Sequence, residues 1–258
     1  MRALLALLLI ALPLSVGADA AEKKGLAIAV EADRRDTGWD DQKADMTMIL
    51  RNKHGQQSRR QVRTRAKEVT NDGDKSFVIF DQPRDVKGTA LLSFSHKIAN
   101  DDQWLYLPAL KRVKRIASAN KSGSFVGSEF AYEDVSSQEV EKYTYKHLRD
   151  EVLADQDSFV IERYPVSKYS GYTRQVVWID KAEYRPLKVD YYDRKNSLLK
   201  TLTFSEYNEY LGKYWRAHKM HMVNHQTGKS TLLEWSNYKL RNGFTDRDFD
   251  KTSLKRVR

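Results

Sequence analysis

The sequence contains no cysteine. Disulfide bonds and metal sites built on thiolates are therefore excluded, and the chain cannot carry an acyl anchor on a cysteine of its own. Its apolar run at residues 3–12 is shorter than the roughly 20 residues that span a bilayer. These absences favour a protein that is free in its compartment rather than anchored to a membrane.

Motifs of catalysis and nucleotide binding are also missing. In the stretch GSFVG at residues 123–127, the serine occupies the wrong position for the nucleophile elbow G-x-S-x-G. The stretch GKS at residues 228–230 lacks the upstream glycine of a phosphate-binding loop, and H-E-x-x-H does not occur. No pair of carboxylates is marked out as an acid–base couple. The sequence therefore predicts a protein that is not an enzyme and has no cofactor.

Three histidines, His218, His221 and His225, are the sharpest candidates for metal ligands. On a helix, His221 and His225 would lie on one face and could share a zinc ion. The surrounding residues are typical of a strand, where these two side chains lie two pleats apart and His218 points the opposite way. Exposed strand histidines explain the pattern better, so no metal site is predicted.

The N-terminus has the features of a secretory signal peptide. Arg2 precedes the apolar run, and Ala18-Asp19-Ala20 supplies the small-x-small pattern of a cleavage site. We expect residues 1–20 to be removed during export. Residues 21–258 should form one domain, because no linker composition divides them.

The chain carries a formal charge of +10 at pH 7. Such a charge raises the possibility of nucleic-acid binding. An exported protein meets phospholipid head groups and acidic proteins instead, so we expect no nucleic-acid partner. Solvation of the outer strand faces by Lys and Arg is an alternative explanation for most of this charge.

The pattern after residue 21 is mainly β. A helix is predicted at residues 23–37, where Leu26, Ala27, Val30 and Arg34 fall at helical spacing. Residues 140–152 fit either a helix or strands. Closely spaced strands without long linkers favour one antiparallel sheet that curves on itself. About eleven strands are expected, at residues 44–50, 57–70, 76–80, 89–96, 104–107, 158–163, 172–179, 186–192, 198–207, 213–224 and 230–240.

Composition changes most sharply between Gln103 and Val135. An aromatic strand ends at Pro108, which cannot donate to a sheet ladder. A basic group, a Ser/Gly-rich stretch at 118–127 and an acidic-aromatic stretch at 129–134 follow. Because binding residues concentrate in such connections, we expect function here. The basic group consists of Lys111, Arg112, Lys114 and Arg115.

Aromatic residues are abundant, with 14 Tyr, 9 Phe and 5 Trp. They could fill a core. One helix cannot cover the whole apolar face of a sheet, however, so they could equally line a cavity for an apolar ligand. The candidates for cavity lining are Leu92, Phe94, Trp104, Tyr106, Trp178, Tyr191, Phe204 and Trp235.

Two runs of residues carry a resemblance to a known family. WLYLPALKRV at residues 104–113 and SFVGSEFAYED at residues 124–134 resemble the signature of the LolA-like outer membrane lipoprotein-sorting proteins, a bacterial exported family. The similarity continues through Tyr184-Arg185-Pro186 and Tyr191-Tyr192-Asp193 to the strands around Lys219 and Thr231. It covers nearly all of the predicted mature chain.

The resemblance implies an incomplete, unclosed antiparallel β-barrel of about eleven strands, with a few α-helices over a hydrophobic concave face. It implies a monomeric periplasmic carrier that binds acyl chains of a lipoprotein or lipid for trafficking toward the outer membrane. The basic group would contact head groups or an acidic partner at the cavity mouth. The longer branch of the family resembles companions of RND/MMPL-type exporters in the inner membrane. The alternative is therefore an accessory subunit of such an exporter, with a packed core.

Overall fold

The structure is a computed structural model that describes residues 16–256. Most of the predicted signal peptide, residues 1–15, lies outside the described residues. Residues 16–20 begin the helix α1 (Val16–Asp36). Within the described part of the chain, no helix combines the length and the apolar character needed to cross a bilayer.

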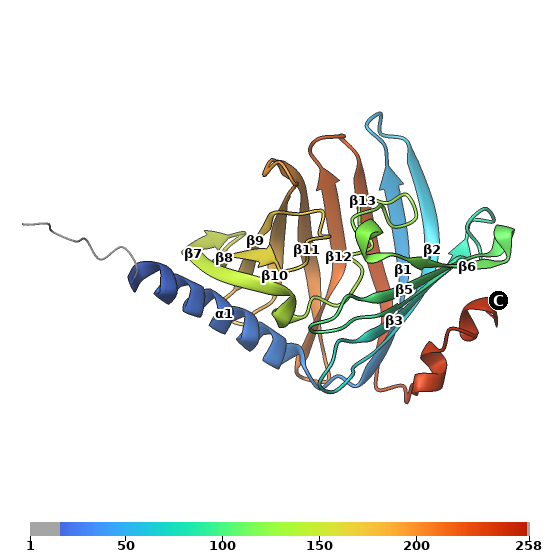
Figure 1. Cartoon of the computed structure of the whole chain (residues 1–258), viewed down its shortest axis with the longest axis horizontal. Coiled ribbons are helices and arrows are strands. Elements are labelled where there is room, and N and C mark those ends of the chain that lie inside the picture. The colour runs from blue at the N-terminus through green and yellow to red at the C-terminus, as the bar shows by residue number, and fades with distance from the viewer. Residues whose placement is uncertain (1–15, 257–258) are drawn as a thin grey trace, which may run out of the picture.

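One antiparallel sheet forms the body of the protein (Figure 1). Strands that follow each other in the chain are neighbours in the sheet, except β6 and β7, which form its two opposite edges. The first and last strands, β1 and β13, pair with each other in the middle. The thirteen strands are β1 (Asp41–Arg51), β2 (Gln57–Lys67), β3 (Lys75–Gln82), β4 (Ala90–Phe94), β5 (Asp102–Leu107), β6 (Arg112–Ile116), β7 (Tyr143–Leu153), β8 (Gln156–Pro165), β9 (Arg174–Asp180), β10 (Pro186–Tyr192), β11 (Leu198–Tyr210), β12 (Tyr214–Asn224) and β13 (Ser230–Leu240).

The prediction of a single curved, unclosed antiparallel sheet is confirmed, with thirteen strands in place of about eleven. The two additional strands are β6 and β7. Strand β6 contains three of the four residues of the basic group, and β7 occupies the stretch for which helix and strand remained open. Only one α-helix accompanies the sheet among residues 16–256; the other helical pieces are short 3₁₀ turns, η1 (Pro108–Leu110), η2 (Ser118–Asn120), η3 (Val140–Lys142), η4 (Asp246–Phe249) and η5 (Ser253–Arg256).

The concave surface of the sheet, called the inner face below, carries the main hydrophobic core. Residues at paired positions of neighbouring antiparallel strands project to the same side. A row of such positions crosses β8 to β12, and every member is buried in one cluster. This row consists of Ile161, Val177, Val189, Leu202 and Met222.

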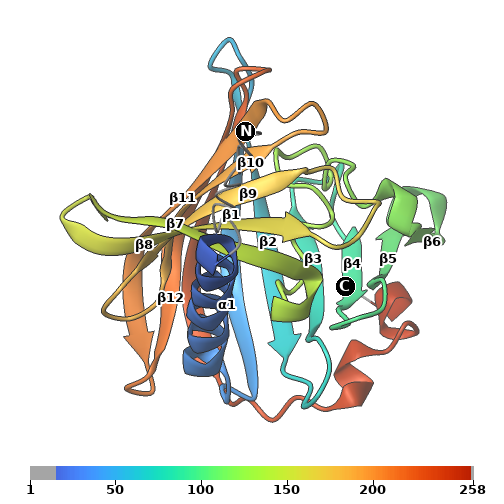
Figure 2. The ribbon, with the colours of Figure 1, turned by 60° about the vertical axis from the view of Figure 1, so that its left-hand side comes forward.

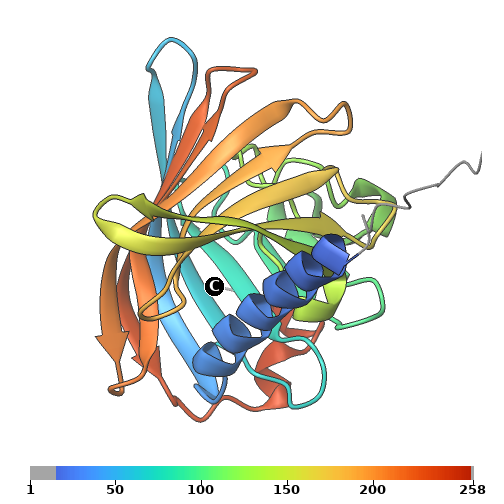
Figure 3. The ribbon, with the colours of Figure 1, turned by 90° about the vertical axis from the view of Figure 1, so that its left-hand side faces the viewer.

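Helix α1 crosses the open side of the curved sheet and packs against β7 (Figures 2 and 3). Ile28 and Ala29 enter the main core. Leu26 and Val30, which define the helical spacing in the sequence, point to solvent instead and are 46% and 48% exposed. Gly25 explains this orientation, because its backbone lies so close to β7 that an added Cβ would meet backbone atoms of Lys146 and His147 at 2.8 Å. Close approach of backbones selects the small-residue face of the helix.

The outer face is covered at one end by the C-terminal segment, which lies beside β3 to β5 (Figure 1). Phe249 of η4 and Leu254 of η5 are 1% and 0% exposed. They pack on a second cluster that includes Phe77, Ile79 and Ala90. Strands β3 to β5 are therefore buried on both faces.

Candidate functional site: the inner face of the sheet

The inner face is graded from apolar to polar along the strands. One pleat from the row that contains Leu202, a second apolar row joins Met48, Leu233, Met220 and Phe204 through paired positions of β1, β13, β12 and β11. On the opposite side of the first row, the next positions are polar. This polar row consists of Arg163, Gln175, Tyr191, Lys200 and Asn224.

All members of the polar row except the partly exposed Arg163 are buried, and their polar groups need hydrogen-bond partners there. Arg163 Nε donates to Gln175 Oε1 at 2.7 Å. Lys200 and Asn224 find their partners in the connection between β6 and β7, residues 117–139, which folds back into the concave side (Figure 1). We call these residues the inner segment. It contains most of the stretch in which the sequence predicts function.

Two aromatic side chains of the inner segment are inserted into the main core. Phe125 and Phe130 are 1% and 2% exposed. The ring of Phe125 lies 5.7 Å from that of Phe80 and 5.8 Å from that of Tyr132. Burial of a phenylalanine contributes about 1.5–3 kcal/mol. The inner face is thus filled at this end by side chains from outside the sheet.

The tip of the inner segment is held in an uncommon backbone conformation. Val126 has φ 48°, in the left-handed region that β-branched residues rarely adopt, and Gly127 follows with φ 78°. The Arg60 guanidinium donates to the carbonyl of Val126. Glu129 N donates to Thr231 Oγ1 at 3.0 Å, which fixes the tip on β13.

A buried ion pair attaches the inner segment to the sheet. Lys200 Nζ lies 2.7 Å from Asp134 Oδ2, and these side chains are only 5% and 3% exposed. Lys200 also donates to the carbonyl of Glu129 at 2.8 Å. Tyr172 Oη donates to Asp134 Oδ1 at 2.8 Å. Burial, followed by the charge of Asp134, raises the pKa of Tyr172 well above its ordinary value, so the phenol remains a neutral donor.

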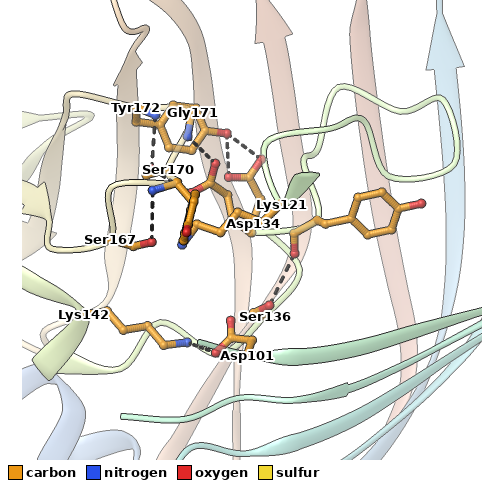
Figure 4. A network of polar contacts seen from close by, with 12 residues as sticks. Asp101, Lys121, Asp134, Ser136, Lys142, Ser167, Ser170, Gly171 and Tyr172 are labelled. Atoms are coloured by element: carbon orange, nitrogen blue, oxygen red, sulfur yellow. Dashed lines mark hydrogen bonds and ion pairs between the residues drawn. The ribbon is translucent and has the colours of Figure 1, made fainter. Parts of the chain in front are cut away.

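Further polar contacts hold the base of the inner segment (Figure 4). The carboxylate of Glu133 accepts from Ser170 Oγ at 2.7 Å and from Gly171 N at 2.8 Å. Burial raises the pKa of Glu133 despite these donors. Lys142, just after the segment, pairs with Asp101 at 2.8 Å. The segment is therefore anchored by specific polar contacts as well as by its two phenylalanines.

The other end of the inner face is less completely covered. Phe204, Met220 and Trp235 pack against the main core but keep part of their surface exposed. The buried Trp235 Nε1 has no hydrogen-bond partner among residues 16–256. Buried indole donors normally have one. This end therefore combines accessible apolar surface with an unsatisfied donor.

Two pockets flank the outer end of the inner segment. One, of about 800 Å³, lies between the segment and the β10–β11 turn, with Ser122 and Lys195 in its wall. The other, of about 280 Å³, lies toward the β1–β2 hairpin. Glu129 lines both. The segment is thus solvated on two sides where it emerges from the core.

The structure separates the predicted cavity residues into three groups. Tyr191, Phe204 and Trp235 belong to the inner-face core. The four from β4 and β5 lie on the outer face beneath the C-terminal segment, and Trp178 lies in a third cluster with Val160 and Val176, away from the inner face. Only the first group is therefore positioned to meet a ligand on the inner face. The four covered residues are Leu92, Phe94, Trp104 and Tyr106.

The predicted basic group straddles the edge strand β6. Lys111 follows η1, and Arg112 and Lys114 pair with Leu107 and Leu105, whose side chains face the inner core. Arg115 projects to the opposite side and pairs with Asp102. All four cations are exposed.

The three histidines do not gather. His218 Nε2 lies 2.8 Å from Tyr210 Oη, and His225 Nε2 lies 2.8 Å from Thr201 Oγ1. His221 is exposed on the strand. No group of three or more potential metal ligands occurs among the residues that the structure describes.

The central contacts of the inner segment could not be recognised from sequence. Lys200 sits in a strand of alternating pattern, and Asp134 lies 66 residues before it. The sequence does hold one signal of a buried lysine: Lys200 lies two residues from Leu202, so both side chains point to the same, buried face of the strand. Only the strand register identifies the carboxylate that Lys200 meets.

Known proteins share this architecture over almost their whole length. A family model described as an uncharacterized protein matches residues 72–256. A domain assigned as an outer membrane lipoprotein-sorting protein from Vibrio parahaemolyticus is 61% identical, with a TM-score of 0.89, over 91% of this chain and 99% of that chain. A DUF1329 family protein from Desulfovibrio piger is 32% identical, with a TM-score of 0.86, over 91% of this chain and 99% of that one.

A more distant structure, a LolA superfamily protein from Nitrosomonas europaea, is 22% identical, with a TM-score of 0.72, over 89% of this chain and 98% of that chain. It shares the fold. No curated protein matches the sequence. On its sequence identity and its fold, the chain belongs to the LolA-like family of outer membrane lipoprotein-sorting proteins.

Proposed function

We propose that this protein is a periplasmic, non-enzymatic carrier that binds the acyl chains of a lipoprotein or lipid on the inner face of its sheet, for trafficking toward the outer membrane. One observation carries the proposal. The apolar inner face is covered not by a second sheet but by two separate elements, α1 and the inner segment. The lipoprotein-sorting name of the similar Vibrio domain supports the same role.

Acyl chains would first meet the less covered end of the inner face. Phe204, Met220 and Trp235 offer partly exposed apolar surface there. Transfer of an acyl chain from water to such a surface is favourable by about 0.8 kcal/mol for each buried CH₂ group. The unpartnered Trp235 Nε1 would donate to a carbonyl of the ligand.

A whole acyl chain needs more of the inner face than this end provides. Phe125 and Phe130 occupy the continuation of the same core. Withdrawal of the inner segment would exchange two aromatic side chains for the acyl chain. The exchange replaces one apolar contact with another, so its cost lies mainly in separating Lys200 from Asp134. Release would follow when the segment closes again.

Export and partners complete the proposal. Removal of residues 1–20 would deliver the domain 21–258 to the periplasm. Its donor would be an inner-membrane transporter, of the RND/MMPL type if the cargo is a free lipid.

A second function has one observation in its favour. Phe125 and Phe130 fill the inner face. If the inner face never opens, the protein could act as an accessory subunit of an exporter. In that case the inner segment would be a permanent part of the core.

Native mass spectrometry of the protein purified from its host envelope separates the two functions. The carrier should retain a lipid or lipopeptide and should bind a fluorescent fatty acid. Phe204→Glu should weaken that binding about tenfold, since an unpaired charge in an apolar site is strongly unfavourable. Val152→Glu, on an exposed part of β7, is the matched control and should bind normally. A mass without ligand, together with no fatty-acid binding, would favour the accessory subunit.

A further inference from the structure

The two edges of the sheet differ in whether another element packs against them. At the β7 edge, α1 packs against the strand with Gly25 in backbone contact. At the β6 edge, residues Arg112–Ile116 pair only with β5. No backbone group of β6 has a further hydrogen-bond partner among the residues that the structure describes. Unpaired backbone groups on an edge strand are a template for another strand.

The open edge is strongly cationic. Lys111, Arg112 and Lys114 are exposed, and none of them has an ion-pair partner within residues 16–256. The loop after β3 adds Arg84 and Lys87 to the same corner of the molecule. That loop meets η1, because an added Cβ on Gly88 would lie 3.2 Å from Pro108 Cγ.

An apolar side chain lies at the start of the edge. Leu110 is 67% exposed, directly before the three free cations. A short strand with exposed cations resists pairing with a copy of itself through charge repulsion. The same charges attract an acidic strand.

We propose that β6 is a docking site for an extended, acidic segment of a partner protein, which adds to the sheet as a further antiparallel or parallel strand. Arg112 and Lys114 are two residues apart and share one side of the sheet with Leu107 and Leu105. Alternate residues of an added strand would lie opposite them. Acidic residues at every second position of the partner match this spacing, and main-chain hydrogen bonds would supply the remaining affinity.

The arrangement favours a peptide over a membrane surface. Anionic lipid would attract the unpaired cations Arg112 and Lys114 but would offer the free backbone groups of β6 no ordered partners. An added acidic strand matches the charges and also pairs with the backbone. This inference does not depend on acyl binding by the inner face.

The test uses a fluorescein-labelled heptapeptide of alternating Asp and Thr, with fluorescence anisotropy as the readout. We expect the Arg112→Glu/Lys114→Glu variant to bind the peptide at least about tenfold more weakly than the unmodified chain, because like charges oppose each other across the strands. The matched control is Lys43→Glu/Lys239→Glu, which reverses two exposed lysines on the central strands β1 and β13. It should bind within about twofold of the unmodified chain at moderate salt.

A second peptide distinguishes strand addition from simple charge attraction. N-methylation at alternate positions removes hydrogen-bond donors without changing charge, so the methylated peptide should lose binding. The unmodified peptide should also slow amide hydrogen exchange within Arg112–Ile116. Equal binding of the two peptides would overturn the proposal, as would absence of peptide binding. If the Arg112→Glu/Lys114→Glu variant lost binding to phosphatidylglycerol vesicles but kept binding to the peptide, the edge would be assigned to a membrane instead. Normal fatty-acid binding by that variant would show that the two sites are independent.

Discussion

Lys200 Nζ and Asp134 Oδ2 lie 2.7 Å apart, and the rest of the chain leaves their side chains 5% and 3% exposed. This pair joins the middle of the sheet to a segment that comes from outside it. Two buried charges that satisfy each other are stable together, but removal of one leaves the other without compensation. The pair is therefore the contact on which closure of the inner segment depends most.

Substitution of either partner alone should destabilise the closed protein. Lys200→Met leaves Asp134 buried with only neutral donors, and the expected loss is about 3–5 kcal/mol of unfolding free energy. The measurement is urea unfolding followed by circular dichroism. The double variant Lys200→Met/Asp134→Leu should recover much of the loss, because it removes both charges. Additive losses in the double variant would show that the two side chains are not coupled.

Gly25→Ala tests how α1 lies on the sheet. Alanine favours helix over glycine by about 1 kcal/mol, but its Cβ would meet the β7 backbone at 2.8 Å. We expect a net loss of about 1–3 kcal/mol in unfolding free energy and faster amide exchange in β7. Ala27→Leu, on the solvent side of the same helix, should leave stability nearly unchanged. A gain in stability for Gly25→Ala would contradict the close approach.

Asp74 should make stability depend on pH. Burial, and then the charge of Glu139, raises the pKa of Asp74 to about 7 from 3.8. The folded state therefore binds more protons than the unfolded chain between about pH 4 and pH 7, and the unfolding free energy falls as pH rises through that window. Asp74→Asn should remove this slope and stabilise the protein near pH 8 by about 1–2 kcal/mol, a value reduced for partial exposure.

Asp72→Asn is the control, because the pKa of Asp72 is shifted in the direction opposite to that of Asp74. A hydrogen bond from His96 lowers the pKa of Asp72 to about 2. Its contribution to stability is complete above about pH 4 and is lost as pH falls toward 2. This variant should therefore be less stable than the parent near neutral pH. Urea unfolding at several pH values measures both variants, and a destabilised Asp74→Asn near pH 8 would refute the assignment.

Shortening the Phe249 side chain, in the C-terminal segment, tests which face of the sheet binds the ligand. Phe249→Ala should lower the unfolding free energy by about 3–5 kcal/mol, because the side chain fills a closed cluster on the outer face. Fatty-acid binding, measured well below the melting temperature, should not change. A large change in fatty-acid affinity would place the ligand on the outer face, beside Leu92 and Trp104.

Most of the fold could be predicted from the sequence, and the exceptions have a physical cause. Eleven of the strands alternate or form short apolar runs between turn residues. The remaining two, β6 and β7, are the sheet edges. Lys and Arg at the β6 edge interrupt the alternation that identifies a strand, and such charges are usual where an edge faces solvent. Edge strands are therefore the elements most easily missed.

Which face of the sheet the predicted cavity residues occupy was harder to predict from the sequence. Leu92, Phe94, Trp104 and Tyr106 do share one face, as period-two spacing predicts. Strand β4 is buried on both sides, so alternation cannot show which side is concave. The C-terminal segment covers the outer side, and its docking position is a long-range contact without a local signal. The same limit applies to Lys200, whose partner is set by the strand register.

The most direct test of the account asks whether the inner segment must move for acyl chains to bind. Asn224 Nδ2 donates to Glu129 Oε2 at 2.7 Å, and the chain has no cysteine of its own. Cysteines at these two positions, Glu129→Cys and Asn224→Cys, can therefore be joined selectively by a short bis-methanethiosulfonate reagent that dithiothreitol cleaves.

Affinity for a fluorescent fatty acid is then measured before and after cleavage of the bridge. Bridging should weaken binding at least about tenfold, equivalent to 1.4 kcal/mol, and cleavage should restore it. The single variants treated with the same reagent should bind like the unbridged protein. Equal affinity in the bridged and cleaved states would contradict the claim that the inner segment opens to admit the acyl chain.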